Sequence, residues 1–294
     1  MTALWNGLTA YLVDLGQEVG FMHAGGRGDL TFFVRKTQPG CGCGSPQYAF
    51  LKDTEMSPQR SSQKQTAQQS GNGKTDALTS FGSLTDEQLE AHLEVASYGA
   101  FELTDAIRPS VDLKVIPKQG FRHETYVDPT TEAKVPVIMA AATKHRLFDL
   151  FIDMIDTLGP VVDVVLETSH YHTGGHEDYY REHMDMPVLK SILYDYEDML
   201  LNDGCTGIAV LNPQRQQEVQ FDEHKMVIAY GSPLESFERV LISNDVYIDE
   251  EMRFITEAEH VHTSSDQLFE QFQSLAMRLG MESESDQEDD AEYC

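Results

Sequence analysis

Basic residues are scarce in this chain. It has 21 lysines and arginines against 49 aspartates and glutamates, which gives a formal net charge of −28. Nucleic-acid binding draws most of its affinity from basic side chains that neutralise phosphates, so this composition argues against a nucleic-acid partner. The same repulsion argues against an anionic membrane surface. An acidic surface of this kind attracts metal ions and protein partners with basic surfaces.

Long apolar runs are missing, and cysteines are few. No stretch approaches the roughly 18 apolar residues of a membrane-spanning helix, and no basic region precedes an apolar one near residue 1 as in a signal peptide. The four cysteines are too scattered for a disulfide scaffold: Cys41, Cys43, Cys205 and Cys294. These absences predict a soluble, cytoplasmic protein with reduced thiols.

The common sequence signatures of catalysis are missing as well. There is no G-x-S-x-G elbow, no H-E-x-x-H helix and no kinase motif set. The glycine-rich segment 25–28 matches neither a dinucleotide-binding nor a P-loop pattern. Cys41 and Cys43 form a single C-x-C pair, whereas structural zinc sites take four ligands. The motifs therefore leave open whether the protein is an enzyme.

Hydrophobic residues make up 40% of the chain and charged residues 24%, as in an ordinary globular protein. Shifts in composition along the chain predict five regions. These are a small N-terminal segment of one helix and one strand that docks on the rest (1–56), a Ser- and Gln-rich disordered linker (57–83), a helical and short-strand connection (84–134), the main α/β domain (135–281) and an acidic disordered tail (282–294).

Hydrophobic periodicity is strongest in the main domain. It predicts strands at 135–141, 161–168, 206–211, 218–230 and 252–261, and helices at 144–158, 187–202, 233–242 and 265–279. The order from residue 161 is β-α-β-β-α-β, preceded by a β-α unit. This order predicts an α/β (α+β) fold with a mixed sheet of about five strands, ferredoxin-like or related. A doubly wound α/β sheet is the alternative.

Four of the 11 histidines fall within fourteen residues, after the predicted strand at 161–168: His170, His172, His176 and His183. Imidazole nitrogens with nearby carboxylates are ligands that a divalent transition metal such as zinc accepts. Ligands also bind commonly at the carboxyl ends of buried strands in α/β proteins. The cluster therefore predicts a metal site, with a solvent-exposed polar loop as the alternative.

Acidic residues next to these histidines supply candidates for acid–base chemistry. In a metal-dependent hydrolase the histidines, with Asp185 as a further ligand, would hold the ion, and Glu177 or Glu182 would act as the catalytic base. A second pair, His260 and His262, shares one face of the predicted last strand. In the ferredoxin-like arrangement that pair lies at the opposite end of the sheet from His170, so we expect no joint site.

Two functions follow from these observations. The first is a non-enzymatic binding or adaptor module that contacts a protein partner, which explains the missing catalytic motifs. The alternative is the metal-dependent hydrolase built on His170, His172 and His176, which explains the clustering of histidines. We favour the first from the sequence.

Overall fold

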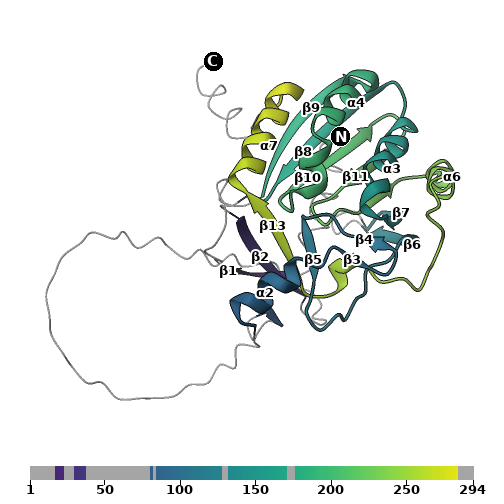
Figure 1. Ribbon diagram of the computed structural model, residues 1–294. Coiled ribbons are helices and arrows are strands. Elements are labelled where there is room, and N and C mark those ends of the chain that lie inside the picture. Colours follow the sequence, from purple (N-terminus) through teal and green to yellow (C-terminus); the bar gives the residue numbers. More distant parts are fainter. Residues whose placement is uncertain are drawn as a thin grey trace, which may run out of the picture.

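The structure is a computed structural model that describes residues 17–22, 30–37, 80–81, 84–127, 132–170 and 176–283. Its elements form one large sheet, one small sheet, a two-stranded hairpin and a set of helices (Figure 1). The predicted helix near residues 2–15, the Cys41–Cys43 pair, most of the predicted linker and the tail beyond residue 283 lie outside the described residues.

The large sheet has eight strands in the order β14-β9-β8-β10-β11-β12-β7-β6, and every neighbouring pair is antiparallel. The strands are β6 (Gly120–Val127), β7 (Lys134–Ala141), β8 (Val161–Thr168), β9 (Glu177–Asp185), β10 (Thr206–Asn212), β11 (Gln217–Phe221), β12 (Val227–Tyr230) and β14 (Glu282–Ser283). Because pairing is antiparallel, the end of β8, the start of β10 and the end of β11 lie at the same edge of the sheet.

Helices cover one face of this sheet (Figure 1). They are α3 (Lys144–Asp156), α4 (Met186–Asp195), α5 (Glu197–Asn202), α6 (Glu235–Ser243) and α7 (Asp266–Leu279). Apolar residues at helical spacing direct seven buried side chains of α3 to the sheet, among them Phe151, which stacks on Phe221 of β11. Burial of each such side chain contributes about 1.5–3 kcal/mol, so this interface is the main hydrophobic core.

The small sheet has the order β1-β2-β13-β5, also antiparallel. Its strands are β1 (Gln17–Met22), β2 (Leu30–Thr37), β5 (Ile107–Pro109) and β13 (His260–Ser265). β13 runs directly into α7, whose first turn is capped by the Ser265 side chain accepting a hydrogen bond from the Leu268 N–H at 3.2 Å. The remaining elements are the helix α2 (Asp86–Leu93), the hairpin β3 (Ser97–Tyr98) with β4 (Phe101–Glu102), and a 3₁₀ turn at Ile255–Glu257.

The small sheet contacts the large one beside Gly204. The Gly204 N–H donates to the Thr263 carbonyl at 2.8 Å, just before β10 begins. A side chain at position 204 would collide with backbone, because an added Cβ would lie 2.4 Å from the Ala106 carbonyl oxygen. β13 therefore crosses the sheet edge where β8 ends and β10 begins.

The mixed α/β class predicted from the sequence is confirmed, and most elements of the main domain lie where periodicity places them. β8 matches its predicted bounds, and β7, α3 and α7 match within two residues. The predicted count of about five strands is wrong, since the sheet has eight. The antiparallel pairing excludes the doubly wound alternative, and the ferredoxin-like order is not confirmed.

Four predicted elements differ from the structure. The helix predicted at 187–202 is two helices, α4 and α5. The strand predicted at 218–230 is two strands, because a turn at residues 222–226 separates β11 from β12. The strand predicted at 252–261 begins only at His260 and belongs to the small sheet. Residues 177–185, predicted as part of a polar connection, form strand β9, whose mostly half-buried or exposed side chains lack an apolar periodicity.

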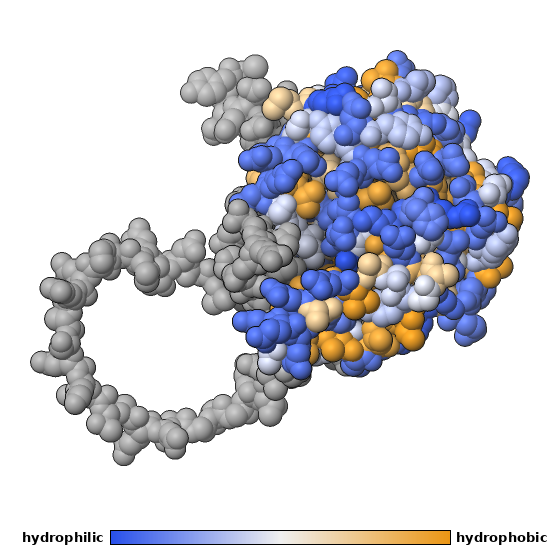
Figure 2. All heavy atoms as spheres, viewed as in Figure 1, coloured by the Kyte–Doolittle hydropathy of each residue, from blue (hydrophilic) through white to orange (hydrophobic). Residues whose placement is uncertain are grey.

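The surface in Figure 2 is largely hydrophilic, with hydrophobic side chains scattered over it. Among the described residues, no helix combines the length and apolar character needed to cross a membrane.

Candidate functional site

Three buried imidazoles meet where β13 crosses the edge of the large sheet. His224 lies in the turn between β11 and β12, and His260 and His262 lie on β13. All three residues are at most 4% exposed. One ligand nitrogen from each lies within 4.8 Å of the other two. We call these residues the tri-histidine cluster.

The turn that carries His224 is held in an unusual backbone conformation. The Asp222 N–H donates to the Met226 carbonyl at 3.1 Å, and the Lys225 N–H donates to the Asp222 carbonyl at 3.0 Å. Lys225 has a φ of 61°, the left-handed region that glycine usually fills at this position of a hairpin. A non-glycine residue there costs roughly 1–2 kcal/mol, and such strain is concentrated at functional sites.

Strand alternation places the other two imidazoles. His260 and His262 are two residues apart on β13, so both project from the same face of the strand. The three ring centres form a nearly equilateral triangle with sides of 4.8 to 5.0 Å. In a tetrahedral metal centre the ion lies about 2.1 Å from each ligand nitrogen and therefore about 3.2 Å from the centre of each ring. Ring centres at tetrahedral angles around the ion are then about 5.2 Å apart. The observed spacing is close to that of a metal centre.

Hydrogen bonds fix which nitrogen of each ring carries the proton. His260 Nδ1 lies 2.7 Å from the Ala258 carbonyl, and His262 Nδ1 lies 2.6 Å from the Gly204 carbonyl. His224 Nδ1 lies 2.8 Å from the Asp222 carboxylate. Each partner only accepts, so each Nδ1 donates and the neutral ring keeps a lone pair on Nε2. A carboxylate or carbonyl behind Nδ1 is the usual outer partner of a metal-binding histidine.

The same hydrogen bond explains why Gly204 is needed beside the cluster. Its carbonyl orients His262, while its N–H pairs with Thr263 on the same strand. An added Cβ would approach Thr263 to 2.9 Å as well as the Ala106 carbonyl. Only glycine lets the backbone before β10 come this close to β13.

A second buried polar group lies on the other side of this glycine. His170, Asp203 and Cys205 each offer a ligand atom within 4.8 Å of the others. His170 Nε2 is 3.1 Å from Asp203 Oδ2, and the Thr206 hydroxyl donates to the same oxygen at 2.5 Å. Burial raises the pKa of Asp203, but hydrogen bonds from His170 and Thr206 and the charge of Lys225 outweigh it, so the net shift is downward.

Lys225 lies between the two groups of side chains. Its buried ammonium donates to the Thr206 carbonyl at 2.9 Å. Burial lowers the pKa of this amine, and the nearby carboxylates of Asp203 and Asp222 oppose that change. The tri-histidine cluster and the His170 group are therefore parts of one buried polar region at a single edge of the sheet.

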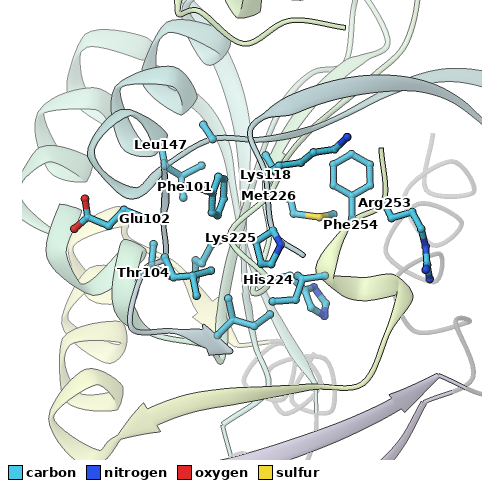
Figure 3. A pocket seen from close by; sticks show the side chains of 16 residues that line it. Phe101, Glu102, Thr104, Lys118, Leu147, His224, Lys225, Met226, Arg253 and Phe254 are labelled. Atoms are coloured by element: carbon cyan, nitrogen blue, oxygen red, sulfur yellow. The ribbon is translucent and has the colours of Figure 1, made fainter. Parts of the chain in front are cut away.

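A pocket with a cavity volume of about 40 Å³ reaches this region from one side. Figure 3 shows His224, Lys225 and Met226 in its wall, and Glu102 pointing away from the other labelled side chains. Most of the lining is apolar, including Phe101, Leu103, Ile107, Leu147, Met226 and Phe254. The cations at its margin are paired, Lys118 with Asp249 and Arg253 with Glu257. The pocket is thus suited to a ligand with a neutral, apolar portion.

The histidines predicted as a single metal cluster from the sequence are not all brought together. His170 is buried in the group with Asp203, whereas His176 is exposed and the His183 side chain is 81% exposed. A bulge between β8 and β9 gives His183 a φ of 55°. His172 lies outside the described residues.

The predicted catalytic carboxylates lie on β9, three strands away from β11 along the sheet. At about 4.8 Å per strand, this separation is about 14 Å. Glu177 accepts a hydrogen bond from the Tyr179 hydroxyl at 3.0 Å, and the exposed Glu182 is 3.9 Å from His183. Asp185 is the residue that precedes helix α4.

Sequence reasoning missed the tri-histidine cluster because it placed the last strand in the main sheet. That arrangement put His262 and His170 at opposite ends, whereas the structure places them on either side of the Asp203–Cys205 segment. The H-x-H spacing on β13 and the D-x-H spacing in the turn were the available signals, since each puts two side chains on one face.

Comparisons with known proteins do not assign a function to this geometry. No protein-family model matches the chain, and no characterised protein or solved structure matches it significantly.

Proposed function

We propose that the protein is a metal-dependent hydrolase whose divalent ion, zinc or a similar metal, is bound by His224, His260 and His262. The observation that carries the proposal is the convergence of three buried imidazoles. Each has an acceptor for its Nδ1 proton, and one ligand nitrogen of each ring lies within 4.8 Å of the other two. Three buried histidines in this arrangement lack any evident structural need, because apolar side chains would fill the same space at lower cost.

The number of ligands favours catalysis over a structural role. Structural zinc sites usually have four protein ligands, whereas catalytic sites have three and keep one position for water. A zinc ion held by these three histidines would lower the pKa of a bound water to about 7 and would supply the nucleophile for hydrolysis. The chain's own residues orient the ligands: Asp222 holds His224, and the Gly204 carbonyl holds His262.

The pocket beside His224 supports a small substrate with an apolar part. His224 belongs both to the cluster and to the pocket wall, so a molecule in the pocket contacts a metal ligand. Apolar walls bind and orient the substrate, and they exclude water from the reacting groups.

The first test is metal content and hydrolysis in matched variants. We expect His262→Ala and His224→Ala each to lose one equivalent of zinc, measured by plasma mass spectrometry after incubation with zinc and gel filtration. Hydrolysis of p-nitrophenyl acetate should fall to the rate without protein. The double variant His176→Ala/His183→Ala removes two exposed histidines and should keep both properties.

Three other outcomes would contradict all or part of this proposal. Unchanged zinc content in His262→Ala would contradict the tri-histidine centre. Zinc loss only in the His176/His183 variant would favour the cluster predicted from the sequence. A zinc-loaded protein that hydrolyses no ester or amide substrate would contradict the hydrolase. The binding or adaptor module and its protein partner remain predictions, and a chain that binds no metal would favour them.

A further inference from the structure

A second set of metal-ligand atoms lies on the opposite side of Gly204 from the tri-histidine cluster. It consists of His170, which follows β8, and of Asp203 and Cys205, which precede β10. Their exposed fractions are 3%, 0% and 2%. One ligand atom of each lies within 4.8 Å of the other two. The three donors are an imidazole nitrogen, a carboxylate oxygen and a thiol sulfur.

The local backbone brings these side chains together. Asp203 ends α5 in an extended conformation and Cys205 follows two residues later in a turn, and a ligand atom of each lies within 4.8 Å of one from His170. The residue between them has no side chain, and its carbonyl is bonded to His262. Strand pairing of Thr168 with Thr206 then places the residues after β8 beside the start of β10.

We propose that His170, Asp203 and Cys205 bind a second divalent metal ion, one that accepts a thiolate ligand, such as zinc. Nitrogen, oxygen and sulfur donors are the three types that zinc uses in proteins. His170 Nε2 and Asp203 Oδ2 are 3.1 Å apart and share a hydrogen bond, whose proton the ion would replace. Two ligands bound at about 2.0–2.1 Å to a tetrahedral ion lie about 3.3 Å apart, so this pair needs little movement to bind one.

Outer hydrogen bonds hold the ligands as they do at known metal centres. The Thr168 hydroxyl is 2.6 Å from His170 Nδ1, which fixes the ring with Nε2 toward Asp203. Asp203 accepts hydrogen bonds from the Thr206 hydroxyl at 2.5 Å and from the Cys205 N–H at 3.1 Å. Such partners keep the ligand atoms in position before the ion binds.

Charge also favours a cation at this point. A buried carboxylate and a thiolate are stable together only when positive charge compensates them. Lys225 lies near Asp203 and Asp222, and a divalent ion bound to Asp203 and Cys205 would add positive charge beside them. The competing account is a hydrogen-bonded network without metal, in which Lys225 is the only cation and Cys205 stays a thiol.

Cobalt(II) distinguishes these accounts and separates this site from the tri-histidine centre. A thiolate ligand gives cobalt a strong near-ultraviolet charge-transfer band, whereas a centre with only histidine ligands gives weaker visible bands. We expect the full-length protein to bind two equivalents of Co²⁺ and to show the near-ultraviolet band. Cys205→Ser should lose the band and one equivalent, and His262→Ala should lose one equivalent and keep the band.

Two further variants control for other thiols and for misfolding. Cys41→Ser/Cys43→Ser removes two other cysteines and should keep the band. His170→Gln, confirmed as folded by circular dichroism, should lose the same equivalent as Cys205→Ser. A single equivalent of Co²⁺ without the band would overturn this proposal and leave the tri-histidine centre intact. Loss of the band in the Cys41/Cys43 variant would also overturn it.

Discussion

The two buried regions of the large sheet differ in what they contain. The face covered by α3, α6 and α7 is mainly apolar, with residues such as Phe151, Phe237 and Leu275 at most 1% exposed. The edge crossed by β13 is buried to the same degree but holds histidines, Asp203, Asp222 and Lys225. Apolar burial stabilises the fold, whereas burial of so many polar groups opposes it. The difference indicates that the buried polar groups at the edge crossed by β13 serve function rather than stability.

Phe237→Ala should have the largest effect on stability and almost none on metal binding. Phe237 is fully buried in α6, whose start contacts the end of the sheet away from the 222–226 turn. Loss of a buried phenylalanine typically costs about 3–5 kcal/mol of unfolding free energy. Urea unfolding measures this loss, and zinc titration of the folded variant should give the wild-type affinity. Weakened zinc binding in the folded variant would mean that the two regions are not separate.

Glu218 should make stability depend on pH. Burial raises its pKa from 4.5 to about 7, partly opposed by the hydrogen bond from Gln220. Between these values the folded protein holds a proton that the unfolded chain has released, so stability falls as pH rises from about 4.5 to 7. The fall amounts to at most about 3.4 kcal/mol, since one pKa unit corresponds to 1.36 kcal/mol.

Glu218→Gln should flatten that dependence, because an amide keeps the acceptor for Gln220 and does not ionise. Urea midpoints at pH 5 and pH 8 measure the effect. Glu235→Gln, a change at an exposed position, should behave as wild type. Equal pH dependence in wild type and Glu218→Gln would show that Glu218 ionises at its ordinary pKa in the fold.

Asp222→Ala should weaken metal binding without removing it. Loss of an outer partner of a metal-bound histidine typically costs 10- to 100-fold in affinity, or about 1.4–2.7 kcal/mol. Asp222→Asn should cost less, since its single amide oxygen can still accept one of the two hydrogen bonds that Asp222 accepts from His224 Nδ1 and the Met226 N–H. Competition with a chromogenic zinc chelator measures both affinities. If the alanine variant keeps the wild-type affinity, Asp222 does not orient the ligand.

Most helices and strands of the main domain could be predicted from the sequence, because their hydrophobic periodicity is a local pattern. β8 and α3 have apolar spacings that specify one buried face each, and the break at Gly159–Pro160 separates them. β9 could not be predicted in this way, because most of its residues are half-buried or exposed and have no apolar alternation. The pairing of β13 with β2 joins residues more than 220 positions apart, and no local pattern predicts it.

The candidate site depends on that long-range pairing. The sequence directed attention to histidines that are close along the chain, and His170 does lie in a buried polar group. His183 projects into solvent because a bulge turns its backbone. His224 and His262 are 38 positions apart in the sequence. Their rings are in contact because His224 lies in a turn of the large sheet and His262 lies on a strand of the small sheet. Only the packing of β13 against the 222–226 turn makes them neighbours.

The most direct test of the tri-histidine centre is a crystal structure of the zinc-loaded protein with anomalous data collected on both sides of the zinc absorption edge. We predict an anomalous peak about 2.0–2.1 Å from Nε2 of His224, His260 and His262. A structure with no peak between these three rings, or with zinc bound only at His176 and His183, would contradict the account.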